Sequence, residues 1–141
     1  MGNWKSAVRV VRSESLERAM AQSAGRATAI DFSGAGGQKT WIGAVTMQPG
    51  GVTGAHHHGR HEVAICVTRG RLEIRWGDHL EYMAEARPGD FVYFEPHVPH
   101  QESNLSDTEP AGYIAVRSDN ERIVVGLDVA PVEPPEAMFV P

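Results

Sequence analysis

Residues 50–62 read GGVTGAHHHGRHE, and residues 96–100 read PHVPH. These two segments hold every histidine of the chain except His79. Because His56 and His58 are two positions apart, their imidazoles point to the same face if the segment is an extended strand. The first segment therefore predicts a strand that presents a pair of ring nitrogens to one side.

A carboxylate and a third imidazole are available to complete a site around that pair. Glu62 ends the first segment, and His100 ends the second. Imidazole and carboxylate together suit a divalent transition metal, whereas Ca²⁺ prefers oxygen ligands alone. A run of histidines can also be a solvated loop, but Glu62 and His100 would then stand at their spacings by coincidence. The two segments together favour a metal site.

The composition is that of one ordinary globular domain. With 141 residues, 41% of them hydrophobic and 22% charged, the chain is long enough for one core and too short for two. The net charge of −5 argues against binding to nucleic acid. No apolar run suggests a membrane span or a signal peptide, and the single Cys66 fits a reducing cytoplasm. We therefore expect one cytoplasmic domain over residues 1–141, with no membrane or nucleic-acid partner.

The chain after residue 40 is typical of short β-strands separated by turns. Residues 71–76 show the clearest alternation, with Leu72, Ile74 and Trp76 on one face and three charged side chains on the other. Glycine, proline and aspartate residues separate the strands. Such a series indicates an all-β sandwich or barrel. The predicted strands span residues 40–47, 63–68, 71–76, 91–94, 112–117 and 122–127.

The two ends of the chain depart from this pattern. Residues 13–24 begin with capping residues and continue with good helix formers, and Gly25 stands at the C-cap, so a short helix is predicted. Residues 130–141 contain four prolines and predict an extended arm rather than a regular strand. Residues 7–12, which read AVRVVR, predict a short N-terminal strand.

The first histidine segment resembles the first of the two motifs of the cupin superfamily, whose fold is a small jelly-roll β-barrel. That motif is a glycine, five residues, His-x-His, three or four residues, a glutamate, six residues and a glycine. Gly50, His56, His58 and Glu62 match its first part. The match departs at the end, because seven residues separate Glu62 from Gly70.

The second segment resembles the second cupin motif, which is a glycine, five residues, Pro-x-Gly, two residues, a histidine, three residues and an asparagine. Gly89, His100 and Asn104 match it, while Glu95 and His97 stand where the motif has its proline and second glycine. A histidine can adopt the left-handed conformation that such a turn requires. Two motifs in the right order make the resemblance specific, and it covers about residues 40–117.

Two residues compete for the carboxylate position of the first motif. Strict alternation backwards from Val63 puts His61, not Glu62, on the inward face of the strand. A β-bulge here would return Glu62 to the interior, and bulges are common beside active sites. We expect Glu62 to be the ligand, with His61 as the alternative. His97 is expected either close to the ligands or at the surface.

The resemblance implies an all-β fold, a double-stranded β-helix cupin barrel over about residues 40–127 with a short N-terminal helix. It implies one divalent transition metal (Fe, Mn, Ni, Zn or Cu) held by His56, His58, Glu62 and His100. It also implies a metal-dependent enzyme of dioxygenase, isomerase or lyase type that acts on a small molecule. The alternative is a non-catalytic module that binds a metal or a small ligand, or a sensor. Cupins commonly pair, so a homodimer that exchanges its terminal arms is expected.

Other side chains are expected to surround the ion. Bulky residues of the strands would line the barrel and exclude water. Glu102 follows His100 by two residues and is a candidate acid on the inner wall, whereas His57 and Gln101 should point outward. The candidate lining residues are Trp41, Met47, Trp76, Phe91 and Tyr93.

Overall fold

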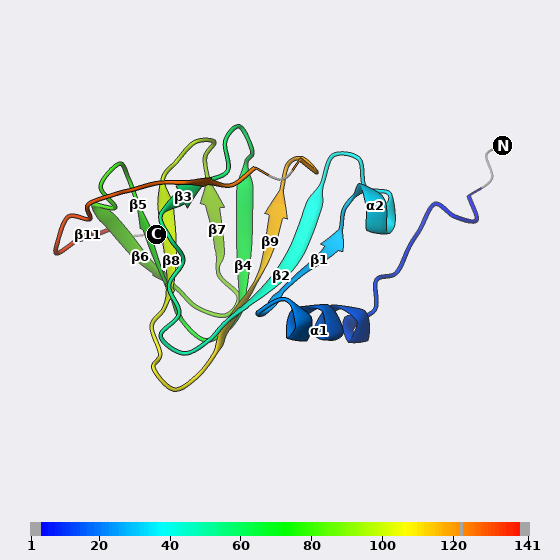
Figure 1. The fold of residues 1–141 in the computed structure, drawn as a ribbon, viewed down its shortest axis with the longest axis horizontal. Helices are drawn as coiled ribbons and strands as arrows, with labels where there is room; N and C mark the ends of the chain where they lie inside the picture. Colours follow the sequence, from blue (N-terminus) through cyan, green and yellow to red (C-terminus); the bar gives the residue numbers. More distant parts are fainter. Residues whose placement is uncertain (1–3, 122, 139–141) are drawn as a thin grey trace.

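The protein, seen in a computed structural model that describes residues 4–121 and 123–138, consists mainly of two β-sheets whose inner faces share one core (Figure 1). The first sheet has five strands in the order β1-β2-β9-β4-β7, and the second has six in the order β10-β3-β8-β5-β6-β11. Neighbouring strands are antiparallel, except that β11 runs parallel to β6. The predicted all-β jelly-roll architecture is confirmed.

The strands of the first sheet are β1 (Arg26–Ile30), β2 (Trp41–Met47), β4 (Val63–Arg69), β7 (Phe91–Phe94) and β9 (Ala111–Arg117). Those of the second are β3 (His56–His57), β5 (Leu72–Trp76), β6 (Tyr82–Ala86), β8 (His100–Asn104), β10 (Val125–Gly126) and β11 (Glu136–Ala137). Five of the six strands predicted from the sequence agree with these bounds to within one residue. The sixth, over residues 122–127, shortens to β10, and residue 122 lies outside the described residues.

Alternation of buried and exposed residues builds the core between the sheets. Along β4, Val63, Ile65 and Val67 are buried while their neighbours are more exposed. Leu72 and Ile74 of β5 approach from the other sheet and belong to the same cluster. Each fully buried side chain of this size contributes about 1.5–3 kcal/mol through the apolar surface that it removes from water. The apolar side chains at every second position of these strands therefore hold the two sheets together.

Four strands were not predicted, namely β1, β6, β8 and β11. β8 reads HQESN, which contains no β-branched or large apolar residue. Its neighbours impose the strand conformation, because β8 pairs along its whole length with β5 and also pairs with β3 at His100. Intrinsic strand propensity is a weak guide where neighbouring strands on both sides complete the hydrogen bonds.

The helix α1 (Ser13–Gln22) confirms the predicted N-terminal helix and ends two residues early. Gly25 has a φ of 84°, and its N–H donates to the Met20 carbonyl at 2.8 Å, which closes the C-terminal turn. The helix packs against β1 and β2. A second, one-turn helix, α2 (Phe32–Ala35), follows β1. None of the described helices has the length and apolar character needed to cross a membrane.

The N-terminal segment before α1 extends away from the sheets (Figure 1). Residues 7–12 form no strand within the described chain, so the predicted N-terminal strand is wrong for a single copy of the protein. The side chains of Val8 and Val10 are exposed. The physical reason is that a strand needs a partner, and among residues 4–121 and 123–138 no strand pairs with this segment.

The C-terminal arm crosses over both sheets to reach β6 (Figure 1). The arm was predicted to contain no regular strand, yet Glu136 and Ala137 form the short strand β11, while residues 139–141 lie outside the described residues. The N–H groups of Glu136 and Met138 donate to carbonyls of Glu81 and Met83. Pro131, Pro134 and Pro135 precede this stretch, so they do not interrupt its hydrogen bonds.

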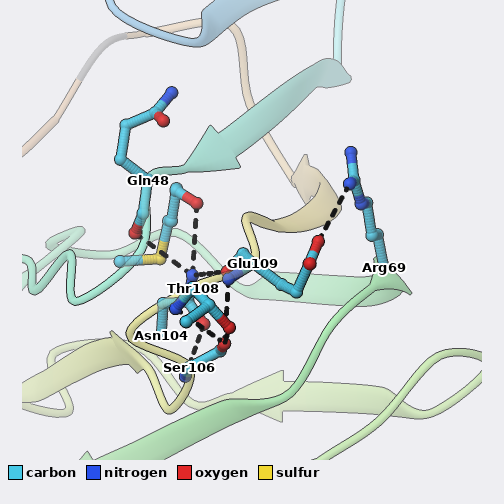
Figure 2. Close-up of polar contacts among 7 residues, drawn as sticks. Gln48, Arg69, Asn104, Ser106, Thr108 and Glu109 are labelled. Atoms are coloured by element: carbon cyan, nitrogen blue, oxygen red, sulfur yellow. Dashed lines mark hydrogen bonds and ion pairs between the residues drawn. The ribbon is translucent and has the colours of Figure 1, made fainter.

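Asn104 organises the turn that follows β8 (Figure 2). Its amide nitrogen Nδ2 donates to the carbonyls of Met47, Gln48 and Glu109 at 3.3, 3.1 and 2.8 Å, and its Oδ1 accepts the Ser106 N–H at 3.0 Å. The last residue of the second motif is therefore a buried connection between the end of β8 and the end of β2. It shapes the fold at the end of β8 that lies away from the histidines.

Candidate metal centre

The structure brings together His56, His58 and His100. One ring nitrogen of each lies within 4.8 Å of the corresponding nitrogens of the other two. Strands β3 and β8 pair directly at His56 and His100, and His58 follows β3 with the alternation that returns it to the same side. The ring centroids are 4.4 to 5.3 Å apart. Two remote segments of the chain thus converge through the pairing of β3 with β8.

Each of the three rings is held by a backbone carbonyl through its Nδ1 atom. A neutral imidazole that donates from Nδ1 carries its lone pair on Nε2. Histidines that bind metals characteristically donate their other ring nitrogen in this way, which sets the tautomer and the ring orientation. The acceptors are the carbonyls of Gly54 for His56 (2.7 Å), Ile123 for His58 (3.0 Å) and Val98 for His100 (3.0 Å).

Burial keeps two of these rings neutral. Together with the nearby positive charge of Arg117, it lowers the pKa of His58 to about 3. Burial also lowers the pKa of His100, against the opposing influence of the Glu102 carboxylate. A neutral imidazole is the form that binds a metal. Burial therefore keeps these two rings in the metal-binding form at neutral pH.

The Nε2 atom of His100 is buried and has no hydrogen-bond partner among the described residues. Such an atom costs about 1–3 kcal/mol when nothing compensates it. A metal ion bound to the lone pair would compensate it. Three imidazoles with open coordination positions fit Fe, Mn, Ni, Zn or Cu in the divalent state. The donor set and the orphaned nitrogen both fit a transition metal.

Glu62 is not among the residues that the structure brings together. Val63 opens β4 with its side chain in the core, so Glu62 faces the opposite side, where its carboxylate accepts the Tyr93 hydroxyl at 3.1 Å. The pairing of β4 is regular from Val63 onward, and its register shift lies between Val67 and Arg69. The bulge that would have turned Glu62 inward is therefore not found beside it.

His61 occupies the inward position that alternation indicated. Its side chain is only 2% exposed, and neither ring nitrogen has a hydrogen-bond partner among the described residues. Burial lowers the pKa of His61, so the ring is neutral. The three-histidine group does not include it. His61 is thus a buried polar side chain two residues before the start of β4.

His57 and His97 form a separate pair of rings, with centroids 5.7 Å apart. The left-handed turn expected at His97 is confirmed by its φ of 65°. The N–H of His97 donates to the Gly59 carbonyl, and the N–H of Gly59 donates to Nδ1 of His57. This pair therefore connects the two histidine segments outside the three-histidine group.

The predicted lining residues divide into two sets. Met47 is buried in the core, and Trp41 and Trp76 pack against it. Phe91 and Tyr93, however, are 80% and 58% exposed, so they do not lie in the barrel interior as predicted, although both contribute to the wall of an open cleft. The alternation along β7 turns these two side chains outward because its inward positions are Val92 and Phe94.

Two residues that matter for the interior come from β7 and β8. The Phe94 ring lies against the His100 ring, with centroids 4.2 Å apart. Phe94 was not singled out from the sequence, although alternation along residues 91–94 leaves it as one of two inward positions. Glu102 is 4% exposed, as expected of an acid on the inner wall.

A cleft of about 680 Å³ opens between β7 and the β5–β6 pair. Phe94 belongs to its wall and also touches His100, so the cleft ends close to the histidines. Its wall is mainly apolar, with acidic side chains among the rest, and this composition suits a small organic molecule. The principal lining residues are Ile74, Trp76, Phe91, Tyr93, Phe94 and Val98.

The fold and the site together define a class, that of small jelly-roll barrels in which two sequence segments gather histidines on the inner wall. The chain belongs to the cupin family, because the family model described as "Cupin domain" matches residues 43–117, more than half of the 141 residues. The match spans both histidine segments and the strands that carry them.

Solved structures with this fold include a cupin 2 domain-containing protein from Halorhodospira halophila, which is 27% identical, with a TM-score of 0.63 and coverage of 73% of this chain and 68% of that one. The polyketide cyclase RemF from Streptomyces resistomycificus is 21% identical, with a TM-score of 0.63 and coverage of 78% and 73%. An oxalate oxidase is 20% identical, with a TM-score of 0.62 and coverage of 74% and 56%. The chain therefore spans little more than half of that oxidase. No curated protein matches the chain.

Proposed function

We propose that this chain is a cytoplasmic metal-dependent enzyme that holds one divalent transition metal (Fe, Mn, Ni, Zn or Cu) through His56, His58 and His100 and acts on a small molecule. The observation that carries the proposal is the common arrangement of the three rings. Each donates Nδ1–H to a backbone carbonyl, and the ring nitrogens gather within 4.8 Å. That arrangement leaves the lone pairs available for one ion.

Such an ion supplies Lewis acidity, activation of water or redox chemistry at its open positions. The residues of the chain supply the rest. The carbonyls of Gly54 and Val98 hold His56 and His100 in orientation. Phe94 excludes water from one side of His100, and the cleft beside it admits a substrate. An apolar wall of this kind favours a small substrate with aromatic or aliphatic parts.

The neighbouring folds are compatible with catalysis of this kind. One is a polyketide cyclase and another an oxalate oxidase, so the same barrel serves both ring closure and oxidation. At 21% and 20% identity these likenesses concern the fold, and function depends on the site. We therefore propose the reaction class only as dioxygenase, isomerase or lyase, and a non-catalytic metal or ligand sensor remains the alternative.

The metal site is tested by elemental analysis of protein purified without added metal. A His56→Ala, His100→Ala double variant should lose the ion completely. The matched control is His79→Ala, which removes an exposed histidine in a turn and should retain the native stoichiometry. Full metal content in the double variant would refute the proposed site.

Catalysis is tested by turnover of a panel of small aromatic and carboxylic compounds by the metal-loaded protein. Oxygen consumption that disappears in the double variant supports a dioxygenase, and anaerobic conversion supports an isomerase or lyase. Tight metal binding without turnover of any panel member would favour the sensor.

We also propose a homodimer. β7 is an edge strand of the first sheet, and its outward Phe91 is 80% exposed. Exposed edges with apolar side chains favour pairing with another chain. The exposed Val8 and Val10 of the N-terminal segment supply further apolar surface. Sedimentation at micromolar concentration should give the mass of two chains, and a monomer would refute this proposal.

A further inference from the structure

We infer that Glu102, and not Glu62, supplies the carboxylate oxygen of the metal centre. The inference rests on the proposed metal site and adds a fourth ligand to it from a position at which neither cupin motif specifies a residue. Glu102 lies on β8, two residues after His100, and therefore shares the inward face of the strand. Its side chain is 4% exposed, and its Oε1 atom lies 3.7 Å from Nε2 of His100.

The contact between Glu102 and His100 is unfavourable as it stands. Nδ1 of His100 donates to the Val98 carbonyl, so Nε2 carries a lone pair in the neutral ring. That lone pair faces a carboxylate oxygen at a distance too long for a hydrogen bond. Two electron-rich atoms thus face each other in a buried site where little water screens them. A cation bound to both atoms converts this repulsion into attraction.

The distance suits a shared ion. Zn²⁺ and similar ions bind imidazole nitrogen and carboxylate oxygen at about 2.0–2.2 Å, so adjacent ligand atoms lie roughly 3.0–3.5 Å apart. The observed 3.7 Å separation is close to that spacing. The Glu102 carboxylate is not among the ligand atoms that lie within 4.8 Å of one another in the three-histidine group, so the ion would have to draw it towards His56 and His58 by rotation of its side chain.

Thr53 holds the carboxylate in the orientation that this role needs. The Thr53 hydroxyl donates to Oε2 of Glu102 at 3.1 Å, and the Thr53 hydroxyl oxygen accepts the backbone N–H of Glu102 at 3.0 Å. Oε2 is therefore engaged by the hydroxyl, whereas Oε1 is the oxygen that faces His100. Ligating carboxylates are typically held by such a hydrogen bond, which is part of what tunes the metal.

Glu62 shows the opposite features. Its side chain is exposed on the outer side of β4, and its carboxylate accepts a hydrogen bond from the Tyr93 hydroxyl. Reaching the histidines would require the start of β4 to turn over, with loss of its regular pairing. The two glutamates therefore form a matched pair for experiment, because each accepts a hydrogen bond from one hydroxyl and only Glu102 lies close to a ring nitrogen of the three-histidine group.

The test uses Glu102→Gln and Glu62→Gln in the full chain, with Co²⁺ as the probe. We expect Glu102→Gln to weaken Co²⁺ binding by about 10- to 100-fold and to change the visible absorption of the bound Co²⁺, because an anionic oxygen ligand is lost. Glu62→Gln should leave both the dissociation constant and the spectrum unchanged. Native affinity and spectrum in Glu102→Gln, or the loss appearing in Glu62→Gln instead, would overturn the inference.

A second pair of variants serves if Glu102→Gln does not fold, as judged by circular dichroism. Thr53→Val removes the hydroxyl that holds Oε2 and should weaken Co²⁺ binding about tenfold, while Thr53→Ser keeps the hydroxyl and should restore it. Equal affinity in both Thr53 variants and the native protein would count against the inference.

The His56→Ala, His100→Ala variant distinguishes failure of the proposed metal site from failure of the role assigned to Glu102. If it retains Co²⁺, the site itself is wrong, and if it loses Co²⁺ while Glu102→Gln binds normally, only the role of Glu102 is wrong.

Discussion

The buried polar side chains at the two ends of β8 differ in how completely they are hydrogen-bonded. At one end His100 leaves a buried Nε2 atom without a hydrogen-bond partner among the described residues. At the other end Asn104 uses its Nδ2 and its Oδ1, reaching three carbonyls and one backbone N–H (Figure 2). Only three residues of one strand lie between the two side chains, and both are buried, so the contrast does not arise from burial alone.

This contrast distinguishes structural polar groups from ligands. A buried polar group with all its hydrogen bonds made stabilises a unique fold, whereas one left unpaired costs free energy until something binds it. Removing Asn104 should therefore harm folding and spare the metal, and removing His100 should do the reverse. The free energy of unfolding of the metal-free protein measures this difference directly.

The largest loss of stability is expected for Asn104→Ala. The change leaves the carbonyls of Met47, Gln48 and Glu109 without their shared donor, which should lower the free energy of unfolding by about 3 kcal/mol. Urea denaturation measures it. Ser106→Ala, which keeps the Asn104 amide, is the milder control. The contrast between the two ends of β8 would fail if folded Asn104→Ala lost its metal while remaining as stable as the native protein.

The next largest loss is expected for Arg75→Met. Arg75 is 7% exposed, donates to the carbonyls of Leu80 and Val132, and pairs with Glu133 at 2.7 Å. The substitution should lower the free energy of unfolding by about 2 kcal/mol and release the C-terminal arm. Hydrogen exchange at Glu136 and Met138, whose N–H groups bond β6 and the turn before it, should accelerate. Arg71→Met, at an exposed position of the same hairpin, should change neither quantity, and slow exchange in Arg75→Met would contradict the anchoring role.

A smaller effect is expected from pH in metal-free protein. The folded-state pKa of His58 is about 3, below its ordinary value of 6.5, so the unfolded chain binds more protons between these values. The stabilisation is present above about pH 6.5 and is lost as the pH falls towards 3. Between pH 7.5 and 5.5 the loss from His58 should be about 1 kcal/mol.

Urea denaturation in the presence of a chelator measures this dependence. His58→Gln should flatten the slope, whereas His79→Gln, at an exposed position, should keep it. A native protein that becomes more stable on acidification over this range would show that the buried ring is not neutral.

The smallest change is expected for His100→Leu in metal-free protein. The substitution gives up the bond to the Val98 carbonyl but also removes an unpaired buried nitrogen and keeps apolar contact with Phe94. The net change in the free energy of unfolding should stay within about 1 kcal/mol. Added Zn²⁺ should raise the melting temperature of the native protein but not of this variant. A loss as large as that of Asn104→Ala would make His100 a structural residue.

Much of the site could be predicted from the sequence because its decisive features are local. Two histidines separated by one residue share a face of any extended strand, and His97 in a left-handed turn follows from its place in the second motif. Phe91 and Tyr93 were misplaced because alternation along β7 shows which residues share a face without showing which face is inward. The sequence placed Arg75 on the charged face of its strand, and nothing local indicates that a distant arm covers it.

The choice between Glu62 and Glu102 as the metal ligand also could not be made from local sequence. From residue order alone, the chain specifies an all-β barrel of short strands with histidines on one side of two segments, because periodicity and turn chemistry are properties of neighbouring residues. Which carboxylate meets those histidines is decided by strand register, at Val63 for one glutamate and at the pairing of β8 with β3 and β5 for the other. Register depends on partners far away in the chain, so only the assembled barrel determines it.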